Sequence, residues 1–509
     1  MPLRGAPTTK IGGADSCVIR FESWLLGVLL VVAASLRLVH LDAGLWFDEI
    51  DTQVRHVARP LLEIVSTYES QNQHLFYSVA ARLVTSAVGE SAWTLRLPAV
   101  IFGVASIWAT HWFGKRVTAR REALLAAALL TFSYQHVWFS QNARGYTSLL
   151  FFVLLGSGFF LELLRGSIRP RWALTLGYAV AMALAVYTHL TALAVLAVHA
   201  AVWVGLLLRR DENQKSRGAA GPALALAGVL AIVLYLPVLP QIYETLSTPG
   251  VPTRGNVKWQ NPAWFVSETV AELARQFPGG AVGAVMGGLM LVVGVVGALS
   301  YLRQSRVVVS LLLLPSLLTA GAILLSSHNV WPRFFFFSTG FGALMVVRGL
   351  SDLCRFLVPR RATAFGTAVV IVVIAVGAAS VPAAWGPKQR YDEAWRFVET
   401  RRGPDDAVVT LIMSDMPYRA YPGRFPILTD DVEALDCLAL RHRRVWVIRS
   451  FPTRVAAVQP RIWERLRLDY RKVIEFRGSV RDGEVAVLQS EYGNPSHESA
   501  NGQAHPSCD

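Results

Sequence analysis

Apolar windows long enough to cross a lipid bilayer recur along most of this sequence. A helix needs roughly 20 residues to cross the hydrocarbon, and eleven apolar windows of about this length are present. They lie at about 22–41, 96–114, 122–139, 146–165, 172–190, 191–209, 220–241, 279–302, 307–327, 334–350 and 363–385. Because 53% of the 509 residues are hydrophobic and only 17% are charged, one soluble core is excluded. The sequence predicts a polytopic α-helical membrane protein with about 11 transmembrane helices.

Basic residues gather in short loops between these windows. The formal net charge is +14, but no single soluble face carries it, so nucleic acid is not the expected partner. The basic loops contain Lys115, Arg116, Arg120 and Arg121; Arg165, Arg169 and Arg171; Arg209, Arg210, Lys215 and Arg217; Arg303 and Arg306; and Arg355, Arg360 and Arg361. With residues 1–21 in the cytoplasm, eleven crossings place all of these loops inside, as the positive-inside rule requires.

The segment 74–89 is apolar enough to resemble one more crossing. If it crossed, the basic loop 115–121 would lie outside. We therefore expect residues 42–95 to form one external loop whose helices lie along the membrane interface. The outer face then also receives 140–146, 242–278, 328–333 and everything after 385.

A second domain is expected after the last window. At residues 386–390 the composition changes and the apolar runs shorten to strand length. The patterns predict a helix over 392–402, strands over 406–412 and 443–450, a helix over 454–467, and a hairpin of 472–477 with 484–488. These elements predict a small extracytoplasmic α/β domain over 386–490. Residues 491–509, rich in Ser, Asn, Pro and Gly, are expected to be disordered.

Two adjacent acids, Asp48 and Glu49, follow the first window where the chain returns to the outer interface. Trp46 and Phe47 precede them and suit an interfacial anchor. One interpretation is structural, with Asp48 capping a helix that starts at Ile50. The other is catalytic, because one carboxylate can act as a general base.

Polar residues follow at other points of the same face. Arg96 stands at the outer end of the second window, Arg144 in the turn 140–146, and Arg333 before the tenth. Each arginine could simply extend to the interface, but the guanidinium fork also suits phosphate oxygens. Neutral polar groups accompany the arginines, namely Asn72, His74 and Tyr77 in one cluster and Gln141 and Tyr146 in the turn.

Taken together, these motifs resemble a known superfamily. An acidic pair, then Asn-x-His-x-x-Tyr over 72–77, then Arg-Leu-Pro-Ala over 96–99, then Ser-Gln-Asn-Ala-Arg-Gly-Tyr over 140–146 is similar to the GT-C superfamily of polyprenol-phosphate-sugar-dependent membrane glycosyltransferases. That group includes the protein O-mannosyltransferases and the lipid A aminoarabinose transferases. The motifs cover 46–146, and the architecture is compatible to about 490. The chain departs from many relatives in lacking prolines after Asn72.

The resemblance implies a role for each matched residue. Asp48 would be the catalytic carboxylate and Glu49 would complete the acidic pair. Arg96, Arg144 and Arg333 would lie near the lipid phosphate. The substrate-binding group would comprise Asn72, His74, Tyr77, Gln141 and Tyr146.

The residue types fit this chemistry. A lipid-linked sugar phosphate carries a good leaving group, so the acceptor hydroxyl needs a general base, worth roughly 10²–10⁴-fold in rate. Arginines stabilise the charge on the departing phosphate. One base without a covalent intermediate implies inversion. The expected partners are a polyprenyl-phosphate sugar, the bilayer and a glycan, glycolipid or protein acceptor; no cofactor is assigned, and a divalent metal stays an open alternative.

Two other classes are weighed against a transferase. A transporter or flippase of polyprenyl-linked intermediates would also need arginines, but transporters place ionisable groups near the bilayer midplane. Within the windows we note His189 and His199, while acids such as Glu122 and Glu162 stand at the ends. A scaffold protein gives no reason for polar groups on one face. The transferase interpretation is therefore favoured, with catalysis outside the cytoplasm.

Overall fold

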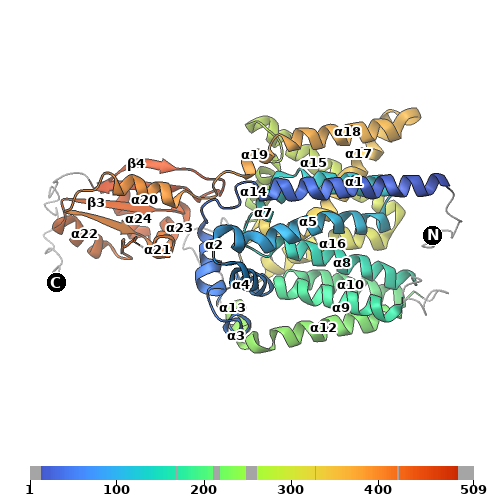
Figure 1. Cartoon of the computed structure of the whole chain (residues 1–509), viewed down its shortest axis with the longest axis horizontal. Coiled ribbons are helices and arrows are strands. Elements are labelled where there is room, and N and C mark those ends of the chain that lie inside the picture. The colour runs from blue at the N-terminus through green and yellow to red at the C-terminus, as the bar shows by residue number, and fades with distance from the viewer. Residues whose placement is uncertain are drawn as a thin grey trace. The chain divides into compact units, whose positions relative to one another are not determined.

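The structure, a computed structural model, describes residues 13–70, 72–166, 170–209, 218–247, 261–326, 328–420 and 423–490, with side chains from residue 19 onward. These residues form two compact units. The helical unit takes residues up to 41, 59–247 and 261–385; the second unit takes 42–58 and 386–490. Figure 1 labels the elements of both. The tail 491–509, expected to be disordered, lies outside the described residues.

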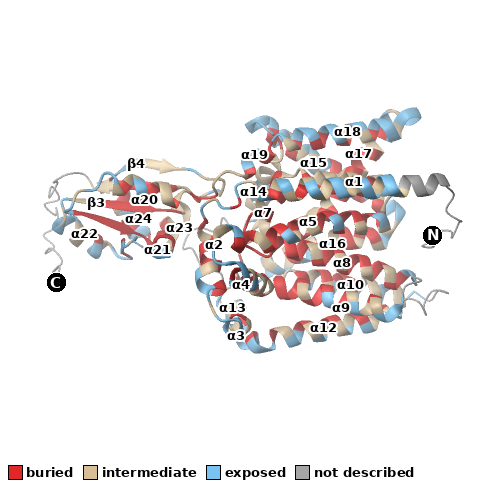
Figure 2. Cartoon of the chain, viewed as in Figure 1, coloured by how far each residue is buried: buried red, intermediate tan, exposed pale blue. Residues whose placement is uncertain are grey.

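The helical unit consists of helices alone among its described residues. They are α1 (Gly13–Leu38), α3 (Leu61–Ser66), α4 (Leu75–Val88), α5 (Ala92–Val117), α6 (Arg120–Thr131), α7 (Tyr134–Ser140), α8 (Tyr146–Arg165), α9 (Arg171–Thr188), α10 (Ala192–Leu207), α12 (Ala220–Tyr235), η2 (Leu236–Val238), α13 (Leu239–Ser247), α14 (Pro262–Ala274), α15 (Gly280–Gln304), α16 (Arg306–Leu325), η4 (Pro332–Ser338), α17 (Thr339–Leu357), η5 (Pro359–Arg361), α18 (Ala362–Ala378) and α19 (Val381–Ala384). The central helix α8 packs against α5, α9 and η4. Figure 2 shows that α1 and α18 expose much of their surface, as apolar helices can where lipid surrounds them.

Eight helices in the described part of the chain are long and apolar enough to cross a membrane. The protein is therefore a multi-pass membrane protein, while the count of eleven stays a prediction. The apolar segment 74–89 forms the shorter helix α4. The window 122–139 is not one continuous helix: its residues form two helices, α6 and α7, separated at Phe132 and Ser133.

The break between α6 and α7 is stabilised by Arg37, which the sequence analysis did not single out. Its side chain is fully buried. The Nη1 and Nη2 atoms donate to the carbonyls of Thr131 and Leu130 at 3.4 and 3.2 Å, at the end of α6, where Leu130 also accepts from the Ser133 N–H at 3.3 Å. Nε donates to Ser140 Oγ at 3.1 Å, and Nη2 to His136 Nδ1 at 2.7 Å. The arginine thus replaces the backbone hydrogen bonds that a continuous helix would have made.

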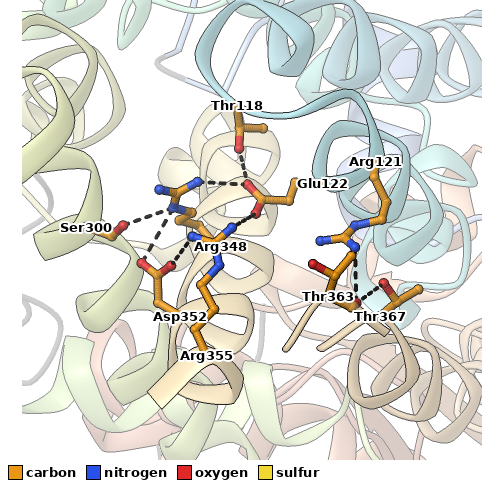
Figure 3. Close-up of polar contacts among 9 residues, drawn as sticks. All are labelled: Thr118, Arg121, Glu122, Ser300, Arg348, Asp352, Arg355, Thr363 and Thr367. Atoms are coloured by element: carbon orange, nitrogen blue, oxygen red, sulfur yellow. Dashed lines mark hydrogen bonds and ion pairs between the residues drawn. The ribbon is translucent and has the colours of Figure 1, made fainter. Parts of the chain in front are cut away.

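A second polar cluster ties together the helix ends that carry the predicted cytoplasmic loops (Figure 3). Glu122, at the start of α6, is buried and lies 3.3 Å from Arg348 Nη1 of α17. Arg348 Nε donates to Ser300 Oγ of α15 at 2.9 Å, and Arg355 Nη1 donates to Asp352 Oδ1 at 3.1 Å. Acids and arginines are therefore paired within the cluster, which indicates a structural role in joining α6, α15 and α17.

The second unit is a five-stranded sheet with helices. Its elements are α2 (Phe47–Asp51), η1 (Thr52–Val57), α20 (Tyr391–Glu399), β1 (Asp406–Thr410), α21 (Ile412–Arg419), β2 (Ile427–Leu428), α22 (Val432–Arg441), β3 (Arg444–Arg449), α23 (Pro452–Val458), α24 (Pro460–Asp469), β4 (Tyr470–Phe476) and β5 (Val485–Ser490). The strand order is β2-β1-β3-β5-β4, with β2, β1 and β3 parallel and β5 antiparallel to both β3 and β4. Figure 2 shows β3 buried at the centre.

The predicted elements of this unit are largely present. The hairpin of β4 and β5 occurs where the pattern placed it. The helix expected over 454–467 is divided into α23 and α24 at Gln459, because Pro460 has no N–H to continue the first helix. The elements β2, α21 and α22 were not predicted. β2 is only two residues long and pairs with Val409 and Thr410 of β1, so no periodicity could reveal it.

A buried carboxylate fixes the start of the parallel strands. The side chain of Asp406 is fully buried and accepts hydrogen bonds from Gly403 N–H at 2.9 Å and Trp446 Nε1 at 3.0 Å, and it pairs with Arg444 at 2.9 Å. Burial alone raises the pKa of Asp406, but these hydrogen bonds and the Arg444 charge outweigh it, so the pKa lies below its usual value. Asp406 therefore joins β1 to β3 as an ionised group.

Candidate functional site

Residues from separate polar motifs meet at one end of the helical unit. Arg144 lies in the turn between α7 and α8, and its guanidinium is almost completely buried. Its Nη2 atom donates to Asn72 Oδ1 and lies 3.1 Å from His74 Nε2. Asn72 and His74 come from the loop that leads into α4. Three of the predicted substrate- and phosphate-binding residues are thus brought into one cluster.

Both ring nitrogens of His74 lie close to a donor. The Gly145 N–H contacts His74 Nδ1 at 3.1 Å. Arg144 can only donate, so its 3.1 Å contact with His74 Nε2 and the Gly145 contact with Nδ1 compete for the one acceptor nitrogen of a neutral ring. The cluster therefore holds a buried guanidinium directly beside an imidazole. A positive charge in this setting suits an anionic oxygen.

Aromatic rings surround these groups. The ring centroid of Tyr146 lies 4.8 Å from that of His74, and the Arg144 guanidinium lies 5.9 Å from the Tyr146 ring. Phe139 and Phe336 pack on Tyr146 at 5.1 and 6.3 Å. Such apolar walls exclude water and strengthen any charged hydrogen bond made inside them.

His189 also belongs to this cluster, although the sequence analysis did not assign it to the site. It caps the end of α9, and its ring lies 5.1 Å from that of His74. Thr191 N–H donates to His189 Nδ1 at 3.2 Å, which leaves the proton on Nε2. Among the described residues, the buried His189 Nε2 and Tyr146 Oη have no hydrogen-bond partner. Two further polar groups are therefore available to a ligand; a histidine at the end of an apolar window was the only sequence signal.

Arg333 adds a fourth segment of the chain to the cluster. It lies in η4, whose Phe334 contacts the His189 ring at 5.4 Å. Its guanidinium is 5.3 Å from the Trp331 ring, and His189 lies within electrostatic range of both Arg333 and Arg144. The cluster thus combines two arginines, two histidines and a tyrosine from four separate segments. We call Asn72, His74, Arg144, Tyr146, His189 and Arg333 the donor cluster.

The side chains of two other predicted residues, Tyr77 and Gln141, donate to backbone carbonyls instead. The Tyr77 hydroxyl donates to the Leu95 carbonyl at 2.7 Å. Gln141 Nε2 donates to the carbonyls of Arg37 and Val39 at 3.1 and 2.6 Å. These contacts fix the first turn of α5 and the end of α1.

Arg96 also contacts backbone. It is almost completely buried, and its Nη1 atom donates to the Leu41 carbonyl at 2.9 Å. Leu41 is the last residue of the helical unit before the segment 42–58. Arg96 therefore fixes the point where the chain leaves the helical unit toward the acidic pair.

Asp48 and Glu49 lie in α2, within the second unit, and both are buried. Glu49 Oε2 accepts a hydrogen bond from Trp46 N–H at 3.3 Å, which is the return contact of a helix N-terminus. The Asp48 carbonyl accepts from Thr52 Oγ1 at 2.8 Å. One interpretation of the sequence assigned the contact at the helix N-terminus to Asp48. In the structure Glu49 makes this contact.

No group of three or more His, Cys, Asp or Glu side chains that could hold a metal ion occurs among the described residues.

Part of the sequence matches a known family. Residues 73–240 match the family model described as "Dolichyl-phosphate-mannose-protein mannosyltransferase". This range includes most of the donor cluster, with Asn72 just before it and Arg333 beyond it. Comparison with curated proteins gives no match.

Solved structures share the fold over most of the chain. The archaeal oligosaccharyltransferase AglB from Archaeoglobus fulgidus, solved with an inhibitory peptide and a dolichol-phosphate, has 13% identity and a TM-score of 0.53 over 85% of this chain and 70% of its own. ArnT from Cupriavidus metallidurans in the apo state has 13% identity and a TM-score of 0.50 over 93% and 98%. At such identities the likeness shows the fold alone. The resemblance to the GT-C fold that the motifs predicted is confirmed.

Proposed function

We propose that this chain is an inverting glycosyltransferase that moves a sugar from a polyprenyl-phosphate-linked donor to an acceptor hydroxyl at the outer face of the membrane. The carrying observation is the donor cluster, in which the buried Arg144 guanidinium lies 3.1 Å from His74 Nε2 and, with Arg333, within electrostatic range of His189. A GT-C fold of the kind solved with a dolichol-phosphate in AglB supports the same ligand class. The sugar and the acceptor stay open.

The donor cluster would hold the phosphate of the lipid carrier. Arg144 and Arg333 would neutralise its charge, and His74, His189 and Tyr146 would donate to its oxygens. As the bond between sugar and phosphate breaks, negative charge gathers on the phosphate, and fixed donors in a water-poor site stabilise that charge more than they stabilise the bound substrate. The cluster would therefore act on the leaving group.

Asp48 would act as the general base that removes the proton of the acceptor hydroxyl. The position of Asp48 in the sequence supports this role. Asp48 comes only a few residues after Leu41, whose carbonyl accepts a hydrogen bond from Arg96. Glu49 is engaged with the Trp46 N–H, so the two acids differ in their tasks. A single base with direct displacement of the phosphate predicts inversion at the anomeric carbon.

A transporter would need a charged side chain that can move with its substrate. The residue to consider for this role is the buried Arg37, beside the break between α6 and α7. Its five N–H groups, however, are all taken up. They donate to Ser140, His136 and the carbonyls of Ala33, Leu130 and Thr131. Arg37 therefore completes the helix break, and we favour the transferase.

Envelope glycans and glycoproteins from cells lacking this protein, analysed by mass spectrometry, test the proposal. A missing hexose or pentose should reappear on complementation with the wild-type chain but not with Arg144→Ala. Unchanged glycans in the deletion, or full complementation by Arg144→Ala at equal protein level, would contradict it.

A further inference from the structure

We infer that the α/β domain positions the acidic pair for the reaction and that Gln389 is the positioning residue. The inference rests on the proposed role of Asp48 as general base. It assigns a task to a domain whose sequence has no catalytic motif.

Gln389 connects α2 to the sheet through both ends of one carboxamide. Its Oε1 atom accepts a hydrogen bond from Phe47 N–H at 2.9 Å, and its Nε2 atom donates to the Gly483 carbonyl at 2.8 Å. Phe47 is the first residue of α2 and directly precedes Asp48. Gly483 lies in the turn between β4 and β5. Since the Gln389 side chain is only 3% exposed, its hydrogen bonds are shielded from water and hold a defined geometry.

A ring contact and a tight approach support the same arrangement. The Phe47 ring meets the Phe451 ring edge-on at 5.5 Å. Phe451 lies two residues after the end of β3 and has φ of 52°, a left-handed conformation that is costly for a bulky residue. Strain of this kind persists only where the surroundings over-determine it. At Gly44, an added Cβ would lie 3.3 Å from Asp392 Oδ2 of α20, so the segment before α2 also lies close to this domain.

The location on the sheet has a physical reason. β1 and β3 are parallel, and their carboxyl ends lead to α21 and to Phe451, respectively. Open sheets with parallel strands offer a crevice beyond the carboxyl ends of those strands, where ligands usually bind. Here α2 of the same chain packs against α21 and Phe451. The binding edge of the domain therefore holds an internal segment that carries the acidic pair.

Asp48 lies within electrostatic range of Tyr391, a polar residue of this edge. The Tyr391 hydroxyl donates to Ser450 Oγ at 3.2 Å. Burial raises the pKa of Tyr391 far above its usual value, and the negative charge of Asp48 adds to that effect. The interaction places the Asp48 carboxylate within electrostatic range of α20 and the end of β3.

Positioning of this kind has a measurable consequence. A general base works only within hydrogen-bond reach of the proton it removes, and a displacement of about 1 Å can cost on the order of 10²-fold in rate. Loss of the Gln389 contacts frees the peptide that precedes Asp48. Turnover should therefore fall, while donor binding, which depends on the donor cluster, should not.

The test compares Gln389→Ala and the similarly sized Gln389→Met with Gln459→Ala. Gln459 is a nearly buried glutamine of the same domain whose Nε2 donates to the Asp430 carbonyl at 3.3 Å, away from α2. Turnover is the rate at which full-length variants in membrane vesicles form the glycan product identified by mass spectrometry. Undecaprenyl phosphate without sugar is the binding probe. We expect a ten- to hundredfold loss of turnover for both Gln389 variants, near-normal turnover for Gln459→Ala, and probe affinity within about twofold of wild type in all three.

A double-mutant comparison separates positioning from general stability. Residues that act through one another have non-additive effects. In the Asp48→Asn background, Gln389→Met should therefore lower the residual turnover no further. An equal loss in both backgrounds, or wild-type turnover in Gln389→Met, would overturn the inference. Normal turnover in Asp48→Asn alone would instead overturn the proposed base, so the two failures are distinguishable.

Discussion

His74 Nε2 and Arg144 Nη2 lie 3.1 Å apart, and the Gly145 N–H contacts His74 Nδ1 at 3.1 Å. A buried guanidinium held beside an imidazole favours a ligand that is small, oxygen-rich and negatively charged. A phosphate group has all three properties. This contact predicts that substitutions of Arg144 have effects that differ from those of an arginine that only anchors a helix at the membrane interface.

Arg144→Lys should weaken binding of undecaprenyl phosphate nearly as much as Arg144→Ala, because an ammonium cannot reproduce the planar fork. Losing a charged hydrogen-bonded contact should cost roughly 2–3 kcal/mol, or about a hundredfold in Kd. Arg121→Lys is the matched control, since Arg121 donates to the Thr363 carbonyl in the other polar cluster (Figure 3). Unchanged probe affinity in both Arg144 variants would leave this arginine a structural group.

Gly145→Ala should disturb the same site without removing any polar group. An added Cβ would lie 2.7 Å from both His74 Nδ1 and Thr188 Cγ2, so His74 must move and its hydrogen bond to the Gly145 N–H must lengthen. We expect a loss of about tenfold in probe affinity, from one weakened hydrogen bond of about 1.4 kcal/mol. Gly205→Ala meets no atom within 4 Å and should bind normally. Equal affinity in the two variants would show that the position of His74 is unimportant.

Asp48→Asn should lower turnover by about two to four orders of magnitude, because the amide cannot accept the acceptor's proton. Probe affinity and protein level should be retained, since Asn has nearly the same volume. Asp51→Asn is the control in the same helix; Asp51 pairs with Arg55 at 3.0 Å. Near-normal turnover of the purified Asp48→Asn protein would exclude Asp48 as the base.

Asp406 should make the α/β domain sensitive to acid. Its folded pKa is below the usual value, so its contribution to stability is present above the unfolded pKa of about 3.9 and is lost as the pH falls through the folded value. Asp406→Asn should cost about 1–3 kcal/mol at neutral pH and flatten the acid side of the unfolding curve. Tryptophan fluorescence during acid titration of the full chain would follow this. Glu464→Gln, which removes an exposed acid, should leave the curve unchanged.

Reporter fusions test the topology. A reporter fused after residue 118, between α5 and α6, should behave as cytoplasmic, because four basic residues surround that junction. A reporter fused after residue 390 should behave as external. If the fusion after 118 were external, α4 would cross the membrane and the shared outer face would be lost.

The sequence by itself determined the properties that depend on local pattern. Length and hydropathy were sufficient for a multi-pass helical protein, since each crossing must bury its own backbone groups in lipid. The alternation of apolar and polar residues, together with the turn residues between the two runs, was sufficient to predict the hairpin of β4 and β5. The order of the motifs was sufficient to predict the GT-C fold. The same motifs contain Asn72, His74, Arg144 and Tyr146, which the structure brings together.

Only the tertiary structure decided which distant groups meet. Arg37 interrupts the expected span 122–139 because its guanidinium satisfies the carbonyls at the end of α6, a contact across about ninety residues that no periodic pattern encodes. His189 joins the donor cluster from the end of α9. Gln389 contacts Phe47 across more than three hundred residues. Such side-chain contacts depend on how the elements pack, and therefore the geometry of the candidate site is a property of the folded chain.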